Sequence, residues 1–432
     1  MSRPLLFFSL TLLPLLASSQ SDRFRYDKDL LTADFHSGRR EALRALMADN
    51  SMAIFYAHRE LIRSNDVEYQ FSQDPNFYYL TGCPEPEAIL VIFKNKVHID
   101  SLYTNEIIFV RKRDPFRETW TGRRLGTEGV KKVLGFKDAL LNTQFESFYP
   151  LLKNFGRDSI GEKNDLQALR EIKTPEEMTL LRKAILITCE SHAVLMQTID
   201  TAMTEYQAQA VVEYGFKVRG SEYPGYPSIV GSGENTCILH YTENRRKFTK
   251  TDLLVVDAGA EYHGYTADIT RTLPVQGTFS KEQKIIYDIV YEAQEAGISA
   301  CHTGNEFRAP HNVAYKVVAK RLKEQGIIKE ESEARKYFFH GTSHYLGLDV
   351  HDAGLYGKLK PGNVITVEPG IYIPEGSDCD PKWWNTGVRI EDDILITNGD
   401  PENLSASLPR KAEEVEALMK KKILFPGLPK EK

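Results

Sequence analysis

Four acidic residues lie inside runs of apolar, β-forming residues, where a charged side chain is costly unless something neutralises it. Two of these runs are Leu253–Ala260 and Tyr265–Thr272, and the other two are Val364–Tyr372 and Gly387–Ile396. The acidic residues are Asp257, Asp268, Glu368 and Glu391. A fold that buries four carboxylates must supply cations or hydrogen-bond donors for them, so these runs constrain the chain more than any other feature.

The first two runs are close enough in sequence to form a hairpin. A hairpin that is symmetric about Tyr262 and His263 places Asp257 directly opposite Asp268, with Cβ atoms about 4.5–5.5 Å apart. Two bare carboxylates at that distance repel each other, and one of them would keep its proton. A bound cation removes this conflict, so the sequence predicts a metal at the end of the hairpin.

Three of the eleven histidines in the chain, His340, His344 and His351, lie within twelve residues. A lone histidine is more often a hydrogen-bonded core residue than a ligand, but three histidines combined with the four carboxylates favour a metal site. Four carboxylates balance the charge of two divalent ions. Oxygen ligands with one histidine suit Mn²⁺, with Zn²⁺, Co²⁺ or Fe²⁺ as alternatives.

Two such ions about 3.5–4 Å apart can hold a bridging hydroxide at neutral pH and polarise a carbonyl group. The pattern therefore predicts metal-assisted hydrolysis. In the fourth run, Arg389 and Glu391 share one face of a strand by the period of two. We expect Arg389 to orient Glu391 or a neighbouring carboxylate, although a purely structural ion pair between the two remains an alternative.

The N-terminal segment differs from the rest of the chain. Arg3 is its only charge before Asp22, Leu5–Leu16 is almost wholly apolar, and small residues follow at 17–19. This pattern is typical of a secretory signal peptide. We expect residues 1–19 to be removed and the mature protein to be exported, either to the periplasm or out of the cell.

Residues 22–165 have the pattern of a smaller α/β domain. A helix is expected over His36–Met47 and strands over Ala88–Phe93 and Ile107–Val110. The polar segment Gly161–Lys173 is expected to be a linker.

A second domain is expected over residues 174–432. Thr174 and Pro175 are typical of the start of a helix. Several strands then follow one another directly, as antiparallel pairs do, which favours an α+β domain.

Composition excludes other classes of protein. The net charge of −5 disfavours a nucleic-acid partner, and the sequence has no apolar run long enough to span a membrane. Five cysteines without a CxxC spacing predict mostly free thiols, although one disulfide remains an alternative.

The sequence resembles the pita-bread metallopeptidases and, within them, the Xaa-Pro aminopeptidases (aminopeptidase P). The segments that carry this resemblance in the second domain are Ile238–Asn244, Val255–Thr272, His340–Asp352, Thr366–Ile373 and Gly387–Asp393. In the first domain they are Arg63–Phe71, Phe77–Gly82 and Glu118–Gly126. The resemblance implies a pita-bread catalytic domain preceded by the N-terminal domain of this family.

The resemblance also implies a role for each site residue. Asp257 would bind one metal, Asp268 and Glu391 would bridge two metals, and His344 and Glu368 would complete the second metal. Glu368 would also carry a proton during catalysis. The residues expected around the substrate and the ligands are His240, His340, His351, Tyr226, Tyr372 and Arg389.

The activity implied is cleavage of the bond between an N-terminal residue and a proline in second position, in a homo-oligomer (dimer or tetramer). The alternative is a prolidase-like Xaa-Pro dipeptidase, with the same metals and a closed cleft. A scaffold without metals, used for binding or as in creatinase, is disfavoured because all five ligands are present.

Overall fold

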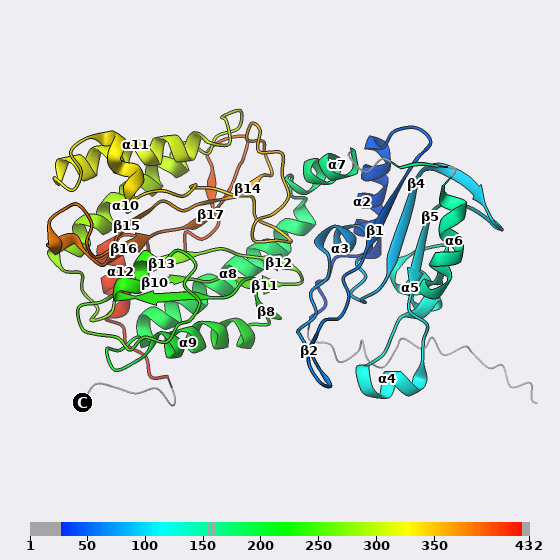
Figure 1. Cartoon of the computed structure of the whole chain (residues 1–432), viewed down its shortest axis with the longest axis horizontal. Helices are drawn as coiled ribbons and strands as arrows, with labels where there is room; N and C mark the ends of the chain where they lie inside the picture. Colours follow the sequence, from blue (N-terminus) through cyan, green and yellow to red (C-terminus); the bar gives the residue numbers. More distant parts are fainter. Residues whose placement is uncertain (1–26, 154, 158–160, 426–432) are drawn as a thin grey trace, which may run out of the picture. The chain divides into compact units, whose positions relative to one another are not determined.

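The structure is a computed structural model of the chain, and it describes residues 27–153, 155–157 and 161–425 (Figure 1). The predicted signal peptide, residues 1–19, lies outside the described residues. None of the described helices has the length and hydrophobicity of a membrane-crossing segment.

The N-terminal domain is built on a five-stranded sheet in the order β6-β5-β4-β1-β7. The strands are β1 (Ser51–Tyr56), β4 (Ile89–Ile99), β5 (Leu102–Val110), β6 (Ala139–Leu141) and β7 (Gly156–Arg157). A separate hairpin joins β2 (Ile62–Ser64) to β3 (Val67–Glu68). The predicted strands correspond to β4 and β5, which are longer than the sequence pattern indicated.

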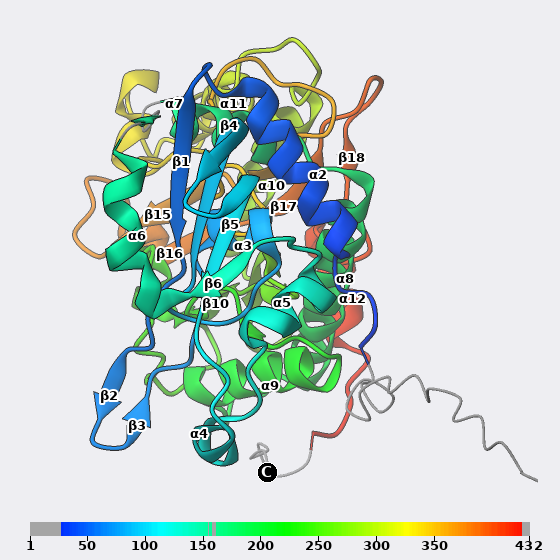
Figure 2. The ribbon, with the colours of Figure 1, turned by 90° about the vertical axis from the view of Figure 1, so that its right-hand side faces the viewer.

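Helices cover both faces of this sheet (Figure 2). The helices of this domain are α2 (Ala33–Leu46), α3 (Pro75–Thr81), α4 (Pro115–Thr121), α5 (Gly126–Leu134), α6 (Phe145–Leu152) and α7 (Gly161–Arg170), of which α4 has no buried residue and does not cover the sheet. Alternate residues of β4 enter two cores, because successive side chains of a strand point to opposite faces. Leu90 packs with residues of α2, α3 and α5, whereas Val91 packs with residues of α6.

The segment Gly161–Lys173 is not the linker that its polarity suggested, because most of it forms α7. Leu166 is buried in the core of the N-terminal domain. Arg170, four residues later, is buried in an ion pair with Asp352. The prediction was wrong because a few buried contacts, including those of Leu166 and Leu169 with the core and that of Arg170 with Asp352, stabilise a helix that is otherwise mostly polar.

The second domain has four small sheets, in the orders β13-β10-β9, β12-β11-β8, β14-β17-β18 and β15-β16. Its first strands are β8 (Tyr223–Pro224), β9 (Ile229–Ser232), β10 (Leu253–Asp257), β11 (Ala260–Tyr262), β12 (Tyr265–Thr266) and β13 (Thr270–Pro274). The later strands are β14 (Val364–Val367), β15 (Gly370–Ile373), β16 (Thr386–Arg389), β17 (Asp392–Leu395) and β18 (Glu402–Asn403). All of these pairings are antiparallel, which confirms the α+β expectation.

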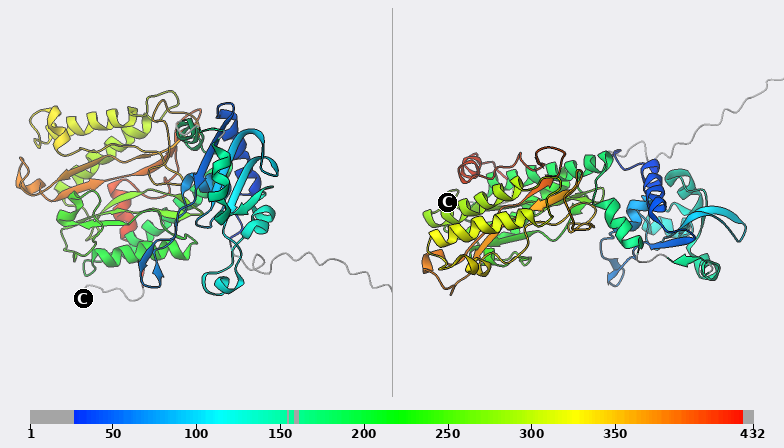
Figure 3. Two further views of the ribbon diagram at one scale, coloured as in Figure 1. Left: turned by 45° about the vertical axis from the view of Figure 1, so that its right-hand side comes forward. Right: turned by 90° about the horizontal axis from the view of Figure 1, so that it is seen from above.

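The strands of this domain lie between two pairs of helices (Figures 1 and 3). The pairs are α8 (Pro175–Thr198) with α9 (Glu205–Val218) and α10 (Lys281–Ser299) with α11 (Ala309–Glu324), and a further helix, α12 (Ala412–Met419), packs against α8. Leu254 and Val256 of β10 pack with α8 and α9, whereas Ile371 of β15 and Val388 of β16 pack with α10 and α11. Two apolar cores therefore fix the strand ends, from which the acidic residues project.

The hairpin that carries Asp257 and Asp268 differs in register from the expectation. Asp257 pairs with Thr270, and the turn is centred on His263 and Gly264 rather than on Tyr262 and His263. His263 and Gly264 have φ values of 50° and 87°, the conformation that a two-residue hairpin turn requires at both central positions. Glycine adopts it readily, so Gly264 shifts the turn by one residue and the two aspartates are not directly opposite.

All five cysteines are free thiols, in agreement with the sequence analysis. Three of them, Cys83, Cys189 and Cys301, are buried.

The start of α8 provides a test of the local sequence signal. The side chain of Thr174 accepts a hydrogen bond from the backbone N–H of Glu177, whose carboxylate accepts one from the backbone N–H of Thr174. Thr174→Ala removes this cap and should lower the free energy of unfolding by about 1 kcal/mol in denaturant titrations. The matched control is Thr179→Ala, on the exposed face of the same helix, where alanine should be neutral or slightly stabilising. Equal losses in the two variants would contradict the capping role.

Candidate active site

A cavity of about 660 Å³ lies where the acidic strand ends of the second domain converge. Its walls include ten of the eleven residues that the sequence analysis singled out, and Tyr372 is the one that does not line it. The ten are Tyr226, His240, Asp257, Asp268, His340, His344, His351, Glu368, Arg389 and Glu391. The sequence therefore located nearly all of the polar wall.

The strand ends explain why these side chains meet. Asp257 is the last residue of β10, Asp268 lies between β12 and β13, and Glu368 directly follows β14. Glu391 lies between β16 and β17. The loop that carries His344 is fixed to β14, because the backbone N–H of Thr366 donates to the carbonyl of His344 at 3.0 Å.

Asp257 and Asp268 share one hydroxyl group. The Tyr226 Oη atom lies 2.6 Å from Asp257 Oδ1 and 2.5 Å from Asp268 Oδ1. A phenol has a single proton to donate, so it cannot satisfy two anionic oxygens at once. Burial and the charge of Asp257 raise the pKa of Asp268 above its ordinary value. The pair therefore needs further positive charge, although the two residues are not directly opposite in the hairpin.

Arg389 supplies part of that charge to Asp257. Its Nη2 donates to Asp257 Oδ2 at 2.6 Å, and its Nη1 donates to the Tyr372 hydroxyl at 2.9 Å. Burial alone would lower the pKa of Arg389, but the neighbouring Tyr372 and Asp257 raise it above its ordinary value. Arg389 thus orients a neighbouring carboxylate, which is one of the two expected outcomes.

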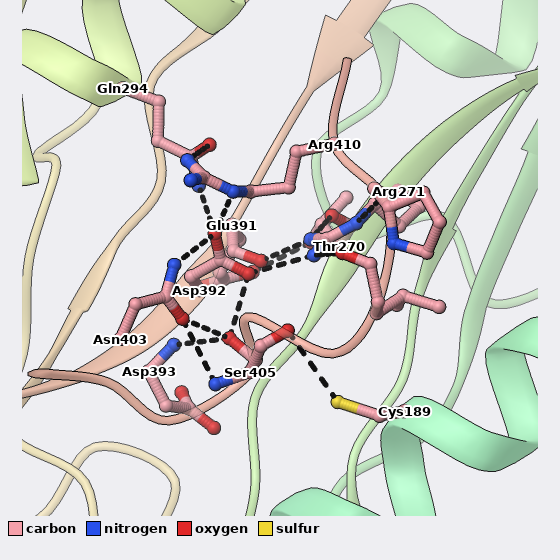
Figure 4. A network of polar contacts seen from close by, with 12 residues as sticks. Cys189, Thr270, Arg271, Gln294, Glu391, Asp392, Asp393, Asn403, Ser405 and Arg410 are labelled. Carbon is pink, nitrogen blue, oxygen red and sulfur yellow. Dashed lines mark hydrogen bonds and ion pairs between the residues drawn. The ribbon is translucent and has the colours of Figure 1, made fainter. Parts of the chain in front are cut away.

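Glu391 is held by β13 (Figure 4). Its Oε2 accepts from the Thr270 hydroxyl at 2.6 Å, and its backbone carbonyl accepts from Arg271 Nη1 at 2.6 Å. The expected continuous strand is interrupted here, because β16 ends at Arg389 and β17 begins at Asp392. The period-of-two argument therefore does not apply to Arg389 and Glu391.

The side chain of Asp392, at the start of β17, fixes the break between β16 and β17 through hydrogen bonds and ion pairs (Figure 4). Its Oδ1 accepts from Arg271 Nη2 at 2.8 Å and from the Ser405 hydroxyl at 2.7 Å. Its Oδ2 accepts from Asn403 Nδ2 at 3.0 Å and pairs with Arg410 Nε at 3.1 Å. The sequence analysis did not identify Thr270 or Arg271. A signal was present, because an arginine inside the apolar run Tyr265–Thr272 needs a buried partner.

Glu368 and His344 complete the acidic wall. His344 Nε2 lies 3.4 Å from Asp268 Oδ2 and 3.7 Å from Glu368 Oε1. Burial opposes the charged form of His344, but its contact with Asp268 and the charge of Glu368 raise its pKa to about 9. Burial raises the pKa of Glu368 to about 7. The raised pKa of His344 reflects the negative charge that Asp268 and Glu368 bring to this cavity.

The residues present fit divalent metal ions. Asp268, His344 and Glu391 each offer a ligand atom, and these atoms lie within 4.8 Å of one another. Burial, together with Asp268 and Glu368, raises the pKa of Glu391 well above its ordinary value. Four carboxylates thus face one cavity whose only arginine is Arg389. Oxygen ligands with one imidazole suit a hard or borderline divalent cation.

The other histidines surround this acidic wall. His340 Nε2 lies 3.0 Å from the Tyr372 hydroxyl, and burial and Arg389 lower its pKa to about 4. The ring of His351 lies 4.2 Å from the ring of His344, between centroids, and is exposed. His240 is also exposed in the cavity wall. Neutral or exposed histidines are suited to contact a bound molecule rather than to balance the carboxylates.

Comparison with known proteins agrees with this geometry. Residues 179–398 match metallopeptidase family M24, and residues 36–160 match the aminopeptidase P N-terminal domain. The Xaa-Pro aminopeptidase of Escherichia coli (strain K12) is 38% identical and covers 88% of this chain and 96% of its own length. Human Xaa-Pro aminopeptidase 3 is 34% identical, over 82% of this chain and 78% of its own length.

Solved structures show the same fold. Aminopeptidase P from E. coli with the inhibitor Pro-Leu has a TM-score of 0.85 at 37% identity, covering 90% of this chain and 99% of its own. Pseudomonas aeruginosa aminopeptidase PepP has a TM-score of 0.86 at 32% identity, covering 91% of this chain and 99% of its own. The chain belongs to metallopeptidase family M24. Because it also carries the N-terminal domain of aminopeptidase P, it falls within that branch of the family.

Two histidines in this cavity should differ in their effect on metal content. His344→Ala should lower the metal bound per chain, because His344 lies among the carboxylates. His351→Ala should leave the metal content near that of the unaltered protein and lower turnover by about 10²–10³-fold, as expected for the loss of a transition-state donor. Metal analysis after dialysis, combined with rate measurements, checks both. Equal metal loss in the two variants would contradict this division.

Proposed function

We propose that this protein is an Xaa-Pro aminopeptidase that uses two divalent metal ions, manganese first among them, to release an N-terminal residue that precedes proline. Its family membership makes it a hydrolase and a metallo-exopeptidase. The observation that carries the proposal is the convergence of five potential ligands, from strand ends far apart in the sequence, on one cavity. Zinc, cobalt or iron(II) are the alternative metals.

The ligands in this proposal are those that the sequence analysis assigned. Asp257 holds one ion, Asp268 and Glu391 bridge both, and His344 and Glu368 complete the second. Arg389 and Tyr226 are positioned to fix Asp257 and Asp268 through their hydrogen bonds. Two divalent ions, when bound, lower the pKa of a water molecule and polarise the carbonyl group of the scissile bond.

The remaining residues act on the peptide. Glu368, which lines the cavity beside His340 and His344, would accept the proton that the attacking water loses and deliver it to the leaving nitrogen. His351 is placed to donate a hydrogen bond to the peptide around the scissile bond, and His340 and His240 line the cavity around the substrate. The acidic cavity also attracts the free ammonium group of the peptide N-terminus.

The preference for proline has a physical basis. The bond before proline is a tertiary amide, which has no N–H. A pocket that packs against the proline ring and offers no acceptor for an N–H would disfavour other residues, because a buried N–H without a partner costs about 1–3 kcal/mol. The E. coli structural neighbour was solved with Pro-Leu, an inhibitor that begins with proline.

Export and assembly complete the proposal. The pattern in residues 1–19 supports export to the periplasm or out of the cell. Sequencing the N-terminus of the mature protein should place the cut near Ser19, and an intact Met1 in the exported fraction would contradict it. We also propose a homo-oligomer, a dimer or a tetramer, as the family resemblance implies.

The bridging role of Glu391 can be tested directly. Glu391→Ala should release metal and abolish almost all activity, because one carboxylate serves both ions and the remaining three would hold them poorly. Metal analysis and turnover measurements on the same sample provide the test. Two ions per chain with normal turnover would rule out the bridging assignment.

Substrate choice separates the proposed activity from its alternatives. Peptides of three or more residues with proline in second position should lose only their first residue, and replacing that proline with alanine should remove most of the rate. Mass spectrometry of the products checks this expectation. Fast cleavage of Xaa-Pro dipeptides without cleavage of matching tripeptides would instead support a prolidase-like dipeptidase. Equal rates on Xaa-Ala and Xaa-Pro peptides would indicate a general aminopeptidase.

A further inference from the structure

A second cavity adjoins the catalytic cavity. It also measures about 660 Å³, and the two cavities share His340, Gly341 and Ser343 in their walls. Its other walls come from residues 307 and 308 before α11, from the first half of α11, from the segment 335–342 and from Tyr356. A peptide that leaves the catalytic cavity past His340 therefore enters this second cavity directly.

The second cavity is basic where the first is acidic. Among the residues that the structure describes, no aspartate or glutamate lines it, and its wall includes Arg308 and Arg335. Both arginines are exposed, and neither makes an ion pair within the part of the chain that the structure describes. Other surface arginines of this domain do have acidic partners, as in the pair of Arg182 with Glu402. Arg308 and Arg335 thus offer two guanidinium groups without a protein counter-ion.

The cavity wall also holds hydroxyl groups that lack a partner. Tyr315 Oη and Ser343 Oγ are buried and make no hydrogen bond within the described residues. A buried hydroxyl without a partner is costly, so these two groups are suited to bind polar atoms of a ligand. His311 differs from them, because its Nδ1 lies 2.9 Å from the Thr342 hydroxyl. Burial and Arg308 lower the pKa of His311, so the positive charge of the cavity comes from the arginines.

We propose that this second cavity binds a carboxylate of the substrate on the C-terminal side of the proline. The carboxylate can be the C-terminus of a short peptide or an acidic side chain. This inference rests on the proposed function, because it orients the peptide with its ammonium group in the acidic cavity. A sphere of this volume is roughly 11 Å across, the length of about three extended residues. The carboxylate should therefore lie within about three residues of the proline.

Tetrapeptides of the form Xaa-Pro-Ala-Ala, with a free or an amidated C-terminus, test this inference. The unaltered protein should have a KM about five- to tenfold lower for the free acid, with a similar kcat, as expected for exposed ion pairs with two arginines. The double variant Arg308→Gln/Arg335→Gln should lose this difference. An amidated peptide with glutamate as its last residue shows whether an acidic side chain can replace the C-terminal carboxylate.

Lys316→Gln is the matched control, because Lys316 is exposed on the same helix, α11, but does not line the cavity. This variant should keep the preference for the free acid. Equal KM values for free and amidated peptides in the unaltered protein would overturn the inference and leave the proposed function intact. Loss of the preference in Lys316→Gln as well would overturn it in favour of a general effect of surface charge. Failure to cleave any Xaa-Pro peptide would instead refute the proposed function.

Discussion

The mutual repulsion of four buried carboxylates is the constraint that the catalytic domain has to satisfy. Two side chains of the protein reduce this repulsion. Arg389 pairs with Asp257, and the hydroxyl of Tyr226 lies between Asp257 and Asp268. These groups do not balance the cavity, because the carboxyl groups of Glu368 and Glu391 still have raised pKa values. The uncompensated charge is what makes the cavity suitable for divalent cations.

The acidic wall depends on a second layer of buried polar contacts. Arg271 and Asp392 are fully buried and form an ion pair at 2.8 Å, and Arg271 also donates to the backbone carbonyl of Glu391. Arg410 and Ser405, from the C-terminal part of the chain, bind the same aspartate. Removing one partner of a buried pair leaves an uncompensated charge, which is strongly destabilising. The position of Glu391 is therefore fixed by contacts that do not face the cavity.

The opposite charges of the two adjoining cavities favour one orientation of a bound peptide. An acidic cavity beside a basic one matches the charges at the two ends of a short peptide, since the ammonium and the carboxylate are separated by a few residues. His340, Gly341 and Ser343 form the wall that the two cavities share. The boundary between the acidic and the basic cavity therefore lies next to the expected position of the scissile bond. Charge alone can thus align a peptide before any side chain is recognised.

The sequence by itself determined which acidic residues and histidines line the cavity, the antiparallel strand pairs and the start of α8, because each depends on residue type and local periodicity. The hairpin register depended on the turn at His263 and Gly264, and α7 depended on the burial of Leu166 and Arg170. Only the tertiary structure decided that Arg389 binds Asp257, from 132 residues away, and that two arginines without an ion pair among the described residues line the cavity next to the catalytic one. Local patterns show which side chains need partners, but folding brings those partners together from distant parts of the chain.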